Sequence, residues 1–209
     1  MGKVFTKKSS NQIIKMFDIK KYFDESSKTI SNLYLFEKEL ISFCNLIHKT
    51  NNNGNKILVA GNGGSCADAE HFTGELQCTY KGANRPPLSA FSITGTSAAL
   101  TAWGNDFGFD TFFERQVLAH GKKNDLLVLI STGGGKIDGA SFNLVKAAII
   151  AKKNGMKIVS LVGKTGGELK EMSDVTFHIK NNITSFIQEA HMSILHCVCE
   201  LLEEKLNKN

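Results

Sequence analysis

Two polar side chains that can bind a metal ion, His71 and Glu75, are four residues apart in GNGGSCADAEHFTGEL, residues 61–76. If this stretch becomes helical after its glycines, both side chains lie on one helix face, as two ligands of the same ion must. A single HxxxE pair is also an ordinary surface contact. The pair therefore indicates metal chemistry only if further ligands come from elsewhere in the chain.

The C-terminal segment offers such ligands. TSFIQEAHMSILHCVCELLEEK (184–205) is typical of a long amphipathic helix, in which Gln188 and His196 are eight residues apart. This spacing places them about 80° apart around the helix and about two turns apart along it, so that both can reach one ion or substrate. His191 is about 140° from His196 and is expected to pack or to lie on the helix surface.

Glycine-rich turns supply a second kind of candidate site. They are GNGGS (61–65), STGGGK (131–136) and GKTGG (163–167). Glycine lets the backbone approach an anion closely, and a following helix directs its N–H groups at that anion. STGGGK adds the hydroxyls of Ser131 and Thr132 and the cation Lys136. No Walker or dinucleotide fingerprint is present, so the turns indicate a single phosphate, unless their glycines only permit tight connections.

These candidates need a scaffold, which the apolar runs predict. Five short runs alternate with helical patterns: KILVAG (56–61), PLSAFSI (87–93), DLLVLIS (125–131), KIVSLVG (157–163) and VTFHIK (175–180). This alternation predicts an α/β fold with a doubly wound, flavodoxin-like parallel sheet flanked by helices. In such sheets ligands bind beyond the carboxyl ends of the strands, where the glycine turns lie.

The N-terminal part has a different pattern. From about Ile13 to Lys49, apolar residues recur near every third or fourth position, and NNNGN (51–55) ends the pattern. We therefore divide the chain into an N-terminal helical segment, residues 1–50, and an α/β domain, residues 51–209. The segment carries many apolar residues for an appendage, so we expect it to pack on the domain and on another subunit.

Composition limits the remaining function classes. Arg85 and Arg115 are the only arginines, and the lysines behind the net charge of +5 are spread along the chain. This argues against nucleic acid and favours small anionic substrates. Five cysteines without a CxxC pair and the lack of a membrane-length apolar run predict a cytoplasmic protein that does not act at a membrane.

Several motifs, in order from about Lys56 to the C-terminus, carry a family resemblance. They are GNGGSxADAxHFxxEL, GND[FY]GF at 104–109, IST at 130–132 and IQExHxxxLHxxCELLE at 187–203. Together they resemble the phosphoheptose isomerases of the sugar isomerase (SIS) fold. That resemblance implies conversion of sedoheptulose 7-phosphate into D-glycero-D-manno-heptose 7-phosphate through an ene-diol, the first step towards ADP- or GDP-heptose precursors of lipopolysaccharide or capsule.

The resemblance also implies site residues, one Zn²⁺ per subunit and a homotetramer. It assigns the metal to His71, Glu75, Gln188 and His196, with Glu75 as base and His196 as acid. The implied substrate-binding residues are Asn62, Gly63, Gly64, Asn105, Asp106, Ser131, Thr132, Gly133, Lys136 and Gln188.

Two departures from the family pattern leave alternatives open. The phosphate turn usually reads STSGNS, whereas this chain has STGGGK, and Ser185 replaces an acidic residue found in some members. We hypothesise that Lys136 contacts the phosphate and compensates for the lost hydroxyls. The alternatives are a different sugar phosphate, an aminosugar-phosphate enzyme or etherase, or a non-catalytic SIS module that senses a sugar phosphate or binds a partner protein.

Overall fold

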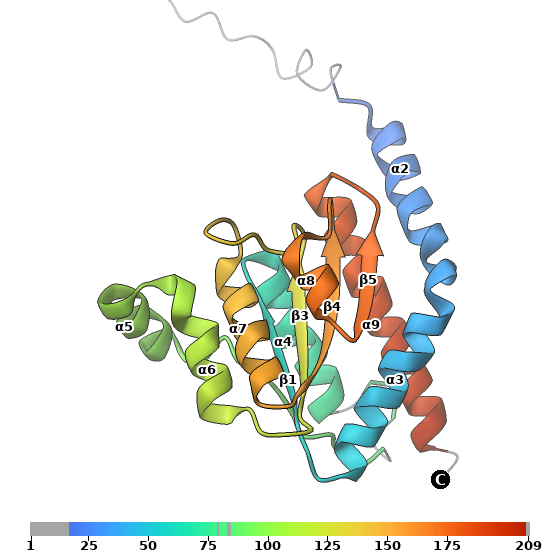
Figure 1. Ribbon diagram of the computed structural model, residues 1–209. Coiled ribbons are helices and arrows are strands. Elements are labelled where there is room, and N and C mark those ends of the chain that lie inside the picture. The colour runs from blue at the N-terminus through green and yellow to red at the C-terminus, as the bar shows by residue number, and fades with distance from the viewer. Residues whose placement is uncertain (1–16, 79, 83–84, 208–209) are drawn as a thin grey trace, which may run out of the picture.

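The computed structural model describes residues 17–78, 80–82 and 85–207, and they form a parallel sheet with helices on both faces (Figure 1). The sheet has the order β2-β1-β3-β4-β5, in which every neighbouring pair is parallel. This is the doubly wound, flavodoxin-like order. The strands are β1 (Ile57–Gly61), β2 (Ala90–Ser92), β3 (Leu126–Ser131), β4 (Lys157–Gly163) and β5 (Val175–Ile179).

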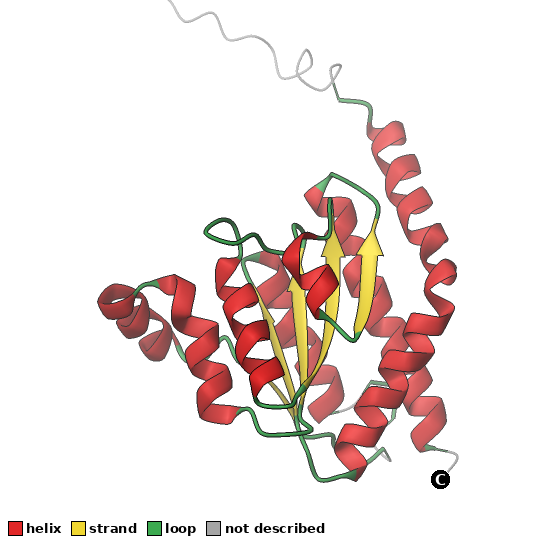
Figure 2. Ribbon diagram, in the orientation of Figure 1, coloured by secondary structure: helices red, strands yellow, loops and turns green. Residues whose placement is uncertain are grey.

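Helices and short 3₁₀ turns connect the strands (Figure 2). They are α2 (Ile19–Ser31), η1 (Asn32–Phe36), α3 (Glu37–Asn52), α4 (Gly64–Gln77), α5 (Ser97–Phe107), η2 (Phe109–Thr111), α6 (Phe112–His120), α7 (Phe142–Lys153), α8 (Gly167–Met172) and α9 (Thr184–Leu206).

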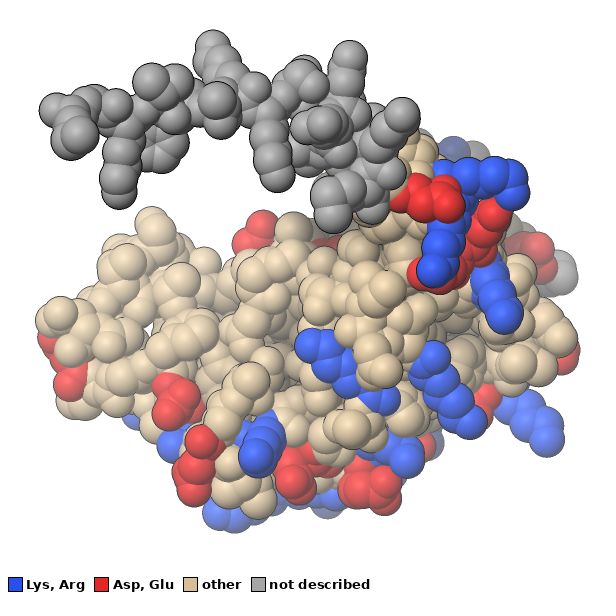
Figure 3. Space-filling model, turned by 90° about the horizontal axis from the view of Figure 1, so that it is seen from above, with Lys and Arg blue, Asp and Glu red and all other residues tan. Residues whose placement is uncertain are grey.

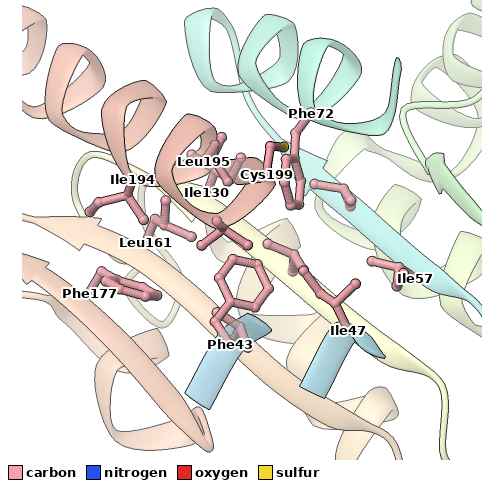
Figure 4. Packing of buried hydrophobic residues seen from close by; sticks show 14 of the residues in the cluster. Phe43, Ile47, Ile57, Phe72, Ile130, Leu161, Phe177, Ile194, Leu195 and Cys199 are labelled. Atoms are coloured by element: carbon pink, nitrogen blue, oxygen red, sulfur yellow. The ribbon is translucent and has the colours of Figure 1, made fainter. Parts of the chain in front are cut away.

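The central strands are apolar on both faces because helices cover both. Every residue of β1 and β3 is buried. Alternate side chains point to opposite faces, so Val59 and Val128 join the core under α3, α4 and α9, whereas Leu58 and Leu127 join the core under α6 and α7. The first of these cores is drawn in Figure 4, where Phe43 from α3 packs beside Phe177 of the sheet.

The N-terminal helical prediction is partly confirmed. Two helices, α2 and α3, cover most of the predicted segment, with the 3₁₀ turn η1 between them. The predicted start near Ile13 lies outside the described residues. Phe43 of α3 is completely buried, whereas Phe23 of α2 is 62% exposed. The first helix pair therefore contributes to the core through α3, and the proposed division at residue 50 stays a prediction.

The second predicted strand was too long. PLSAFSI was predicted over 87–93, but β2 contains only Ala90–Ser92 at the edge of the sheet. Pro86 and Pro87 have no backbone N–H to donate to a neighbouring strand, so pairing starts after them. No helix within the described ranges is both long and apolar enough to cross a bilayer.

Candidate active site

Side chains from α4 and α9 meet on the face of the molecule that these two helices share. The Nε2 atoms of His71 on α4 and His196 on α9 are 3.1 Å apart, although the residues are separated by 125 positions in sequence. Glu75 places its Oε1 atom 3.3 Å from the same Nε2 atom of His71. The structure thus brings together three of the four predicted metal ligands, with His71 between the other two.

Gln188, the fourth predicted ligand, lies at the other end of this helix pair, against the beginning of α4. A Cβ atom added at Gly64 would collide with its side-chain amide. Glycine at position 64 therefore gives the Gln188 amide the space that it occupies. The amide is thereby held beside the GNGGS turn, whose glycines Gly63 and Gly64 begin α4.

Two separations among His71, Glu75 and His196 have the length expected between ligands of one zinc ion. Two ligands at about 2.0–2.1 Å from a tetrahedral zinc ion are about 3.3 Å from each other. The His71–His196 and His71–Glu75 separations of 3.1 and 3.3 Å match this value. Across the described part of the chain, however, His, Cys, Asp and Glu side chains form no group of three arranged around one ion. The fit therefore depends on these two contacts and on the donor chemistry of Gln188.

The turns after β3 and β4 form a separate cleft of about 410 Å³ at the carboxyl ends of the strands. Thr132, Gly133 and Lys136 line it, together with Lys164 from the turn after β4. The Oγ atom of Ser131 accepts a hydrogen bond from the Gly134 N–H at 3.1 Å, which closes the first turn on itself. The cleft combines hydroxyl, backbone and cationic groups, as a phosphate site requires.

The STGGGK turn after β3 and the GKTGG turn after β4 pack closely because glycines lie at their contact. A Cβ atom at Gly134 would collide with the carbonyl of Gly166, and Gly134 has a φ of +74° that favours glycine. The Leu169 N–H donates to the Gly134 carbonyl at 2.9 Å. Figure 3 views this end of the molecule from above and shows Lys or Arg side chains near its mainly uncharged middle, with Asp and Glu side chains around the margin.

Two predicted sugar-binding groups are arranged less simply than expected. The Asn62 side chain exchanges two hydrogen bonds with the Asn143 side chain, at 2.9 and 3.1 Å, so its amide is engaged at the start of α7. Asn105 and Asp106 lie near the end of α5, and Asn105 donates to Asp106 at 2.8 Å. Figure 1 shows α5 on the far side of the molecule from α9. This chain alone does not bring the two α5 residues to the α4–α9 contact.

Two residues were missed by the sequence reasoning: half-buried Asp68 on α4 and exposed Lys164 in the turn after β4. Asp68 is one turn before His71 on α4, and burial raises its pKa to about 6 while the neighbouring His71 opposes that shift. Its Oδ2 atom is buried without a hydrogen-bond partner among the described residues. Lys164 has a φ of +51°, unusual for a residue with a side chain. Its only sequence signal was its place in the GKTGG turn.

His191 proves to be a packed residue, one of the two outcomes expected for it. It is completely buried on α9. Burial lowers its pKa to about 4, and the neighbouring Val162 backbone offsets only part of this. Neither ring nitrogen has a hydrogen-bond partner in the part of the chain that the structure describes. His191 therefore remains neutral near pH 7 and takes no part in the contact between His71 and His196.

Comparisons with known proteins agree on one family. The SIS domain family model matches residues 21–163. The phosphoheptose isomerase of Campylobacter concisus is 40% identical over 186 residues, which cover 89% of this chain and 95% of that protein. A probable phosphoheptose isomerase of Thermoplasma acidophilum is 37% identical over 188 residues, 90% of this chain and 99% of that protein.

A solved structure gives the same answer. The phosphoheptose isomerase of Francisella tularensis superposes with a TM-score of 0.82 at 34% identity, covering 89% of this chain and 96% of that one. At this similarity the shared fold and the shared sequence motifs extend over nearly the whole chain.

Proposed function

The chain belongs to the phosphoheptose isomerases of the SIS domain family, and from this premise we propose how its residues carry out the reaction. The protein is an isomerase, and its proposed substrate is sedoheptulose 7-phosphate. The proposed product is D-glycero-D-manno-heptose 7-phosphate, a first intermediate towards ADP- or GDP-heptose. The observation that carries the proposal is the meeting of His71 and Glu75 with His196, from two distant segments.

The reaction requires a base at carbon and an acid at oxygen. The Glu75 carboxylate takes a proton from C1 of the ketose, while His196 gives a proton to the C2 oxygen, and an ene-diol results. Glu75 then returns a proton to C2, and the C1 hydroxyl proton leaves to His196 as the aldehyde forms. Both groups end in their starting protonation states, so the cycle balances.

We propose that His71, Glu75 and His196 hold one Zn²⁺, and that Gln188, the fourth ligand implied by the family, can reach the ion only if its amide leaves the space beside Gly64. When bound, this ion supplies Lewis-acid stabilisation of the charge that develops on the two substrate oxygens. His71 contributes by orientation, since its Nε2 atom faces both Glu75 and His196. The amide of Gln188, held in the space beside Gly64, is placed to orient the sugar chain near the GNGGS turn.

The phosphate is proposed to bind in the cleft after β3 and β4. Lys136 and Lys164 line this cleft together with Glu168, so its lining offers two positive charges and one negative charge to a group that carries nearly two negative charges at neutral pH. Compared with the usual STSGNS turn, Gly133 and Lys136 stand in place of two serines, so hydroxyl donors are replaced by the ammonium group of Lys136. The altered turn is therefore compatible with phosphate binding.

A homotetramer is proposed from the family, and exposed apolar side chains support association. Phe23 on α2 is 62% exposed, and Tyr34 and Leu35 on η1 are 71% and 67% exposed. Phe23→Glu should lower the molar mass measured by light scattering, because a charge on such a surface opposes burial. Ile149→Glu, on an α7 residue that is 39% exposed, is the matched control. An unchanged mass for Phe23→Glu would remove α2 from the interface.

One assay tests the function as a whole. The purified protein is incubated with a panel of ketose phosphates, including sedoheptulose 7-phosphate, with and without a chelator, and aldose formation is measured. We expect turnover of sedoheptulose 7-phosphate that the chelator abolishes and Zn²⁺ restores. A metal-free protein that binds sugar phosphates without isomerising any of them would support the alternative of a non-catalytic sensor.

A further inference from the structure

Arg85 forms a buried set of hydrogen bonds directly behind the proposed base. Its side chain is only 2% exposed, although it lies in the segment that follows α4. Its Nη2 atom donates to the Glu75 carbonyl, and its Nη1 atom donates to the Leu76 carbonyl at 2.9 Å. On its other edge, Nε donates to the Glu203 carboxylate at 3.2 Å. One guanidinium therefore connects α4 with α9.

At the end of α4, Arg85 supplies hydrogen-bond donors for the last backbone carbonyls. The last carbonyls of a helix have no partner within it, and a cation near them is favourable. The Cys78 N–H donates to the Gly74 carbonyl, and Arg85 donates to the next two, those of Glu75 and Leu76, the second of which also accepts from the Leu88 N–H. The backbone that carries the Glu75 side chain is therefore fixed at its own carbonyl by Arg85.

On α9, the partner of Arg85 is on the same face as His196. Glu203 comes seven residues after His196, which is about two turns and only about 20° around the helix. The Glu203 side chain is 7% exposed and also accepts a hydrogen bond from the Lys81 N–H at 3.2 Å. A planar guanidinium can serve both edges at once, which a lysine ammonium in the same place cannot do.

We propose that Arg85 is a positioning residue of the isomerase: joined to Glu203, it fixes the end of α4 so that Glu75 faces His196. This inference rests on the proposed roles of Glu75 and His196. It predicts that loss of the guanidinium slows the chemical step through misplacement of the base while substrate binding is largely retained.

A second buried ion pair provides the control. Lys56 Nζ lies 2.5 Å from Asp125, whose side chain is 0% exposed. Asp125 also accepts hydrogen bonds from the backbone N–H groups of Lys56 and Lys122. These partners precede β1 and β3, so this pair secures the start of two strands. Removing its charge should destabilise the fold without moving Glu75.

The experiment compares Arg85→Gln, Arg85→Lys, Asp125→Asn and Glu75→Gln in the full-length, zinc-loaded protein. Melting temperatures are measured first, and kinetics with sedoheptulose 7-phosphate follow at a temperature where each variant is folded. We expect Arg85→Gln to lower kcat about 30- to 100-fold with KM changed less than about threefold. Arg85→Lys, which retains the charge and the fold, should still lose about fivefold or more in kcat. Asp125→Asn should keep kcat within about twofold.

The results separate this inference from the function that it builds on. Arg85→Gln and Arg85→Lys with kcat within about twofold of wild type would overturn the positioning role, and so would an equal loss in Asp125→Asn. If Arg85→Gln does not fold, Arg85→Lys decides alone. An active Glu75→Gln would refute the assignment of the base itself, whereas an inactive Glu75→Gln beside fully active Arg85 variants would refute only the role of Arg85.

Discussion

The α4–α9 contact and the turn after β3 differ in construction: the first is built from side chains on helices, the second mainly from glycine-rich backbone. At the first, His71 on α4 lies 3.1 Å from His196 on α9 and 3.3 Å from Glu75 of its own helix, so three ionisable side chains meet at one point. At the second, a glycine-rich backbone and flexible cations surround a cleft of about 410 Å³. If the proposed roles hold, proton transfer depends on particular side chains, whereas a phosphate site can be built from STGGGK as well as from STSGNS, because several donor types serve one anion.

The largest effect should come from Glu75. Glu75→Gln preserves shape but removes the base, so kcat should fall about 1,000-fold or more. Glu70→Gln, on an exposed residue of the same helix, is the control and should remain close to wild type. Steady-state kinetics measure both. Comparable losses in the two variants would mean that α4 is merely sensitive to charge.

A smaller effect is expected at Gly64, whose lack of a side chain leaves space for the Gln188 amide. Gly64→Ala places a Cβ where the Gln188 amide lies, and should lower kcat/KM about 30-fold by displacing it. Gly74→Ala is matched in type and helix, but its Cβ has nothing within 4 Å. That control should lose no activity and gain slightly in melting temperature, since alanine favours helix. Equal kinetics in both variants would show that the position of Gln188 is unimportant.

At the phosphate turn the expected loss is in binding. Lys136→Ala should raise KM about tenfold, the equivalent of about 1.4 kcal/mol, with kcat little changed. Lys152→Ala, at the exposed end of α7, is the control. An unchanged KM for Lys136→Ala would leave the phosphate to Lys164 and the backbone, and the compensation hypothesis for STGGGK would be abandoned.

The smallest expected effect concerns stability alone. Burial lowers the pKa of His191 to about 4, below the ordinary 6.5, so the unfolded chain binds the proton more readily. Stability should therefore be fully present above pH 6.5 and decline as the pH falls towards 4, by at most about 3 kcal/mol.

His191→Phe isolates that effect. The raised pKa of Asp68 acts in the opposite sense over part of this range, so wild type and His191→Phe are compared by denaturant unfolding. The difference in unfolding free energy between the two proteins should change with pH below 6.5. A pH-independent difference would show that the pKa of His191 is the same in the folded and the unfolded protein.

The sequence predicted the scaffold and the pairs within single helices well. The strand runs, the parallel order and the i, i+4 relation of His71 and Glu75 follow from periodicity, which acts over a few residues. The short β2 was overestimated because the apolar run included Pro87, whose missing N–H prevents pairing.

Contacts between distant segments do not follow from periodicity, and the contact of His71 with His196 was anticipated only through the family resemblance. The sequence analysis noted Arg85 only as one of two arginines, whereas the fold places its guanidinium between the Glu75 carbonyl and the Glu203 carboxylate. Asn62 was predicted to face the sugar, yet its amide pairs with Asn143, 81 residues away. The phosphate turn was visible as glycines and hydroxyls, but its contact with the Gly166 turn depends on how β3 and β4 are paired.

The central claim is that the α4–α9 contact transfers the proton while the turn after β3 binds the phosphate. Proton exchange at C1 of the substrate tests it most directly. Sedoheptulose 7-phosphate at saturating concentration is incubated in D₂O with wild-type protein, Glu75→Gln or Lys136→Ala, and loss of the C1 proton signals is followed by NMR. We predict exchange with wild type and with Lys136→Ala, and none above background with Glu75→Gln. Exchange by Glu75→Gln at the wild-type rate would contradict the assignment of proton transfer to the α4–α9 contact.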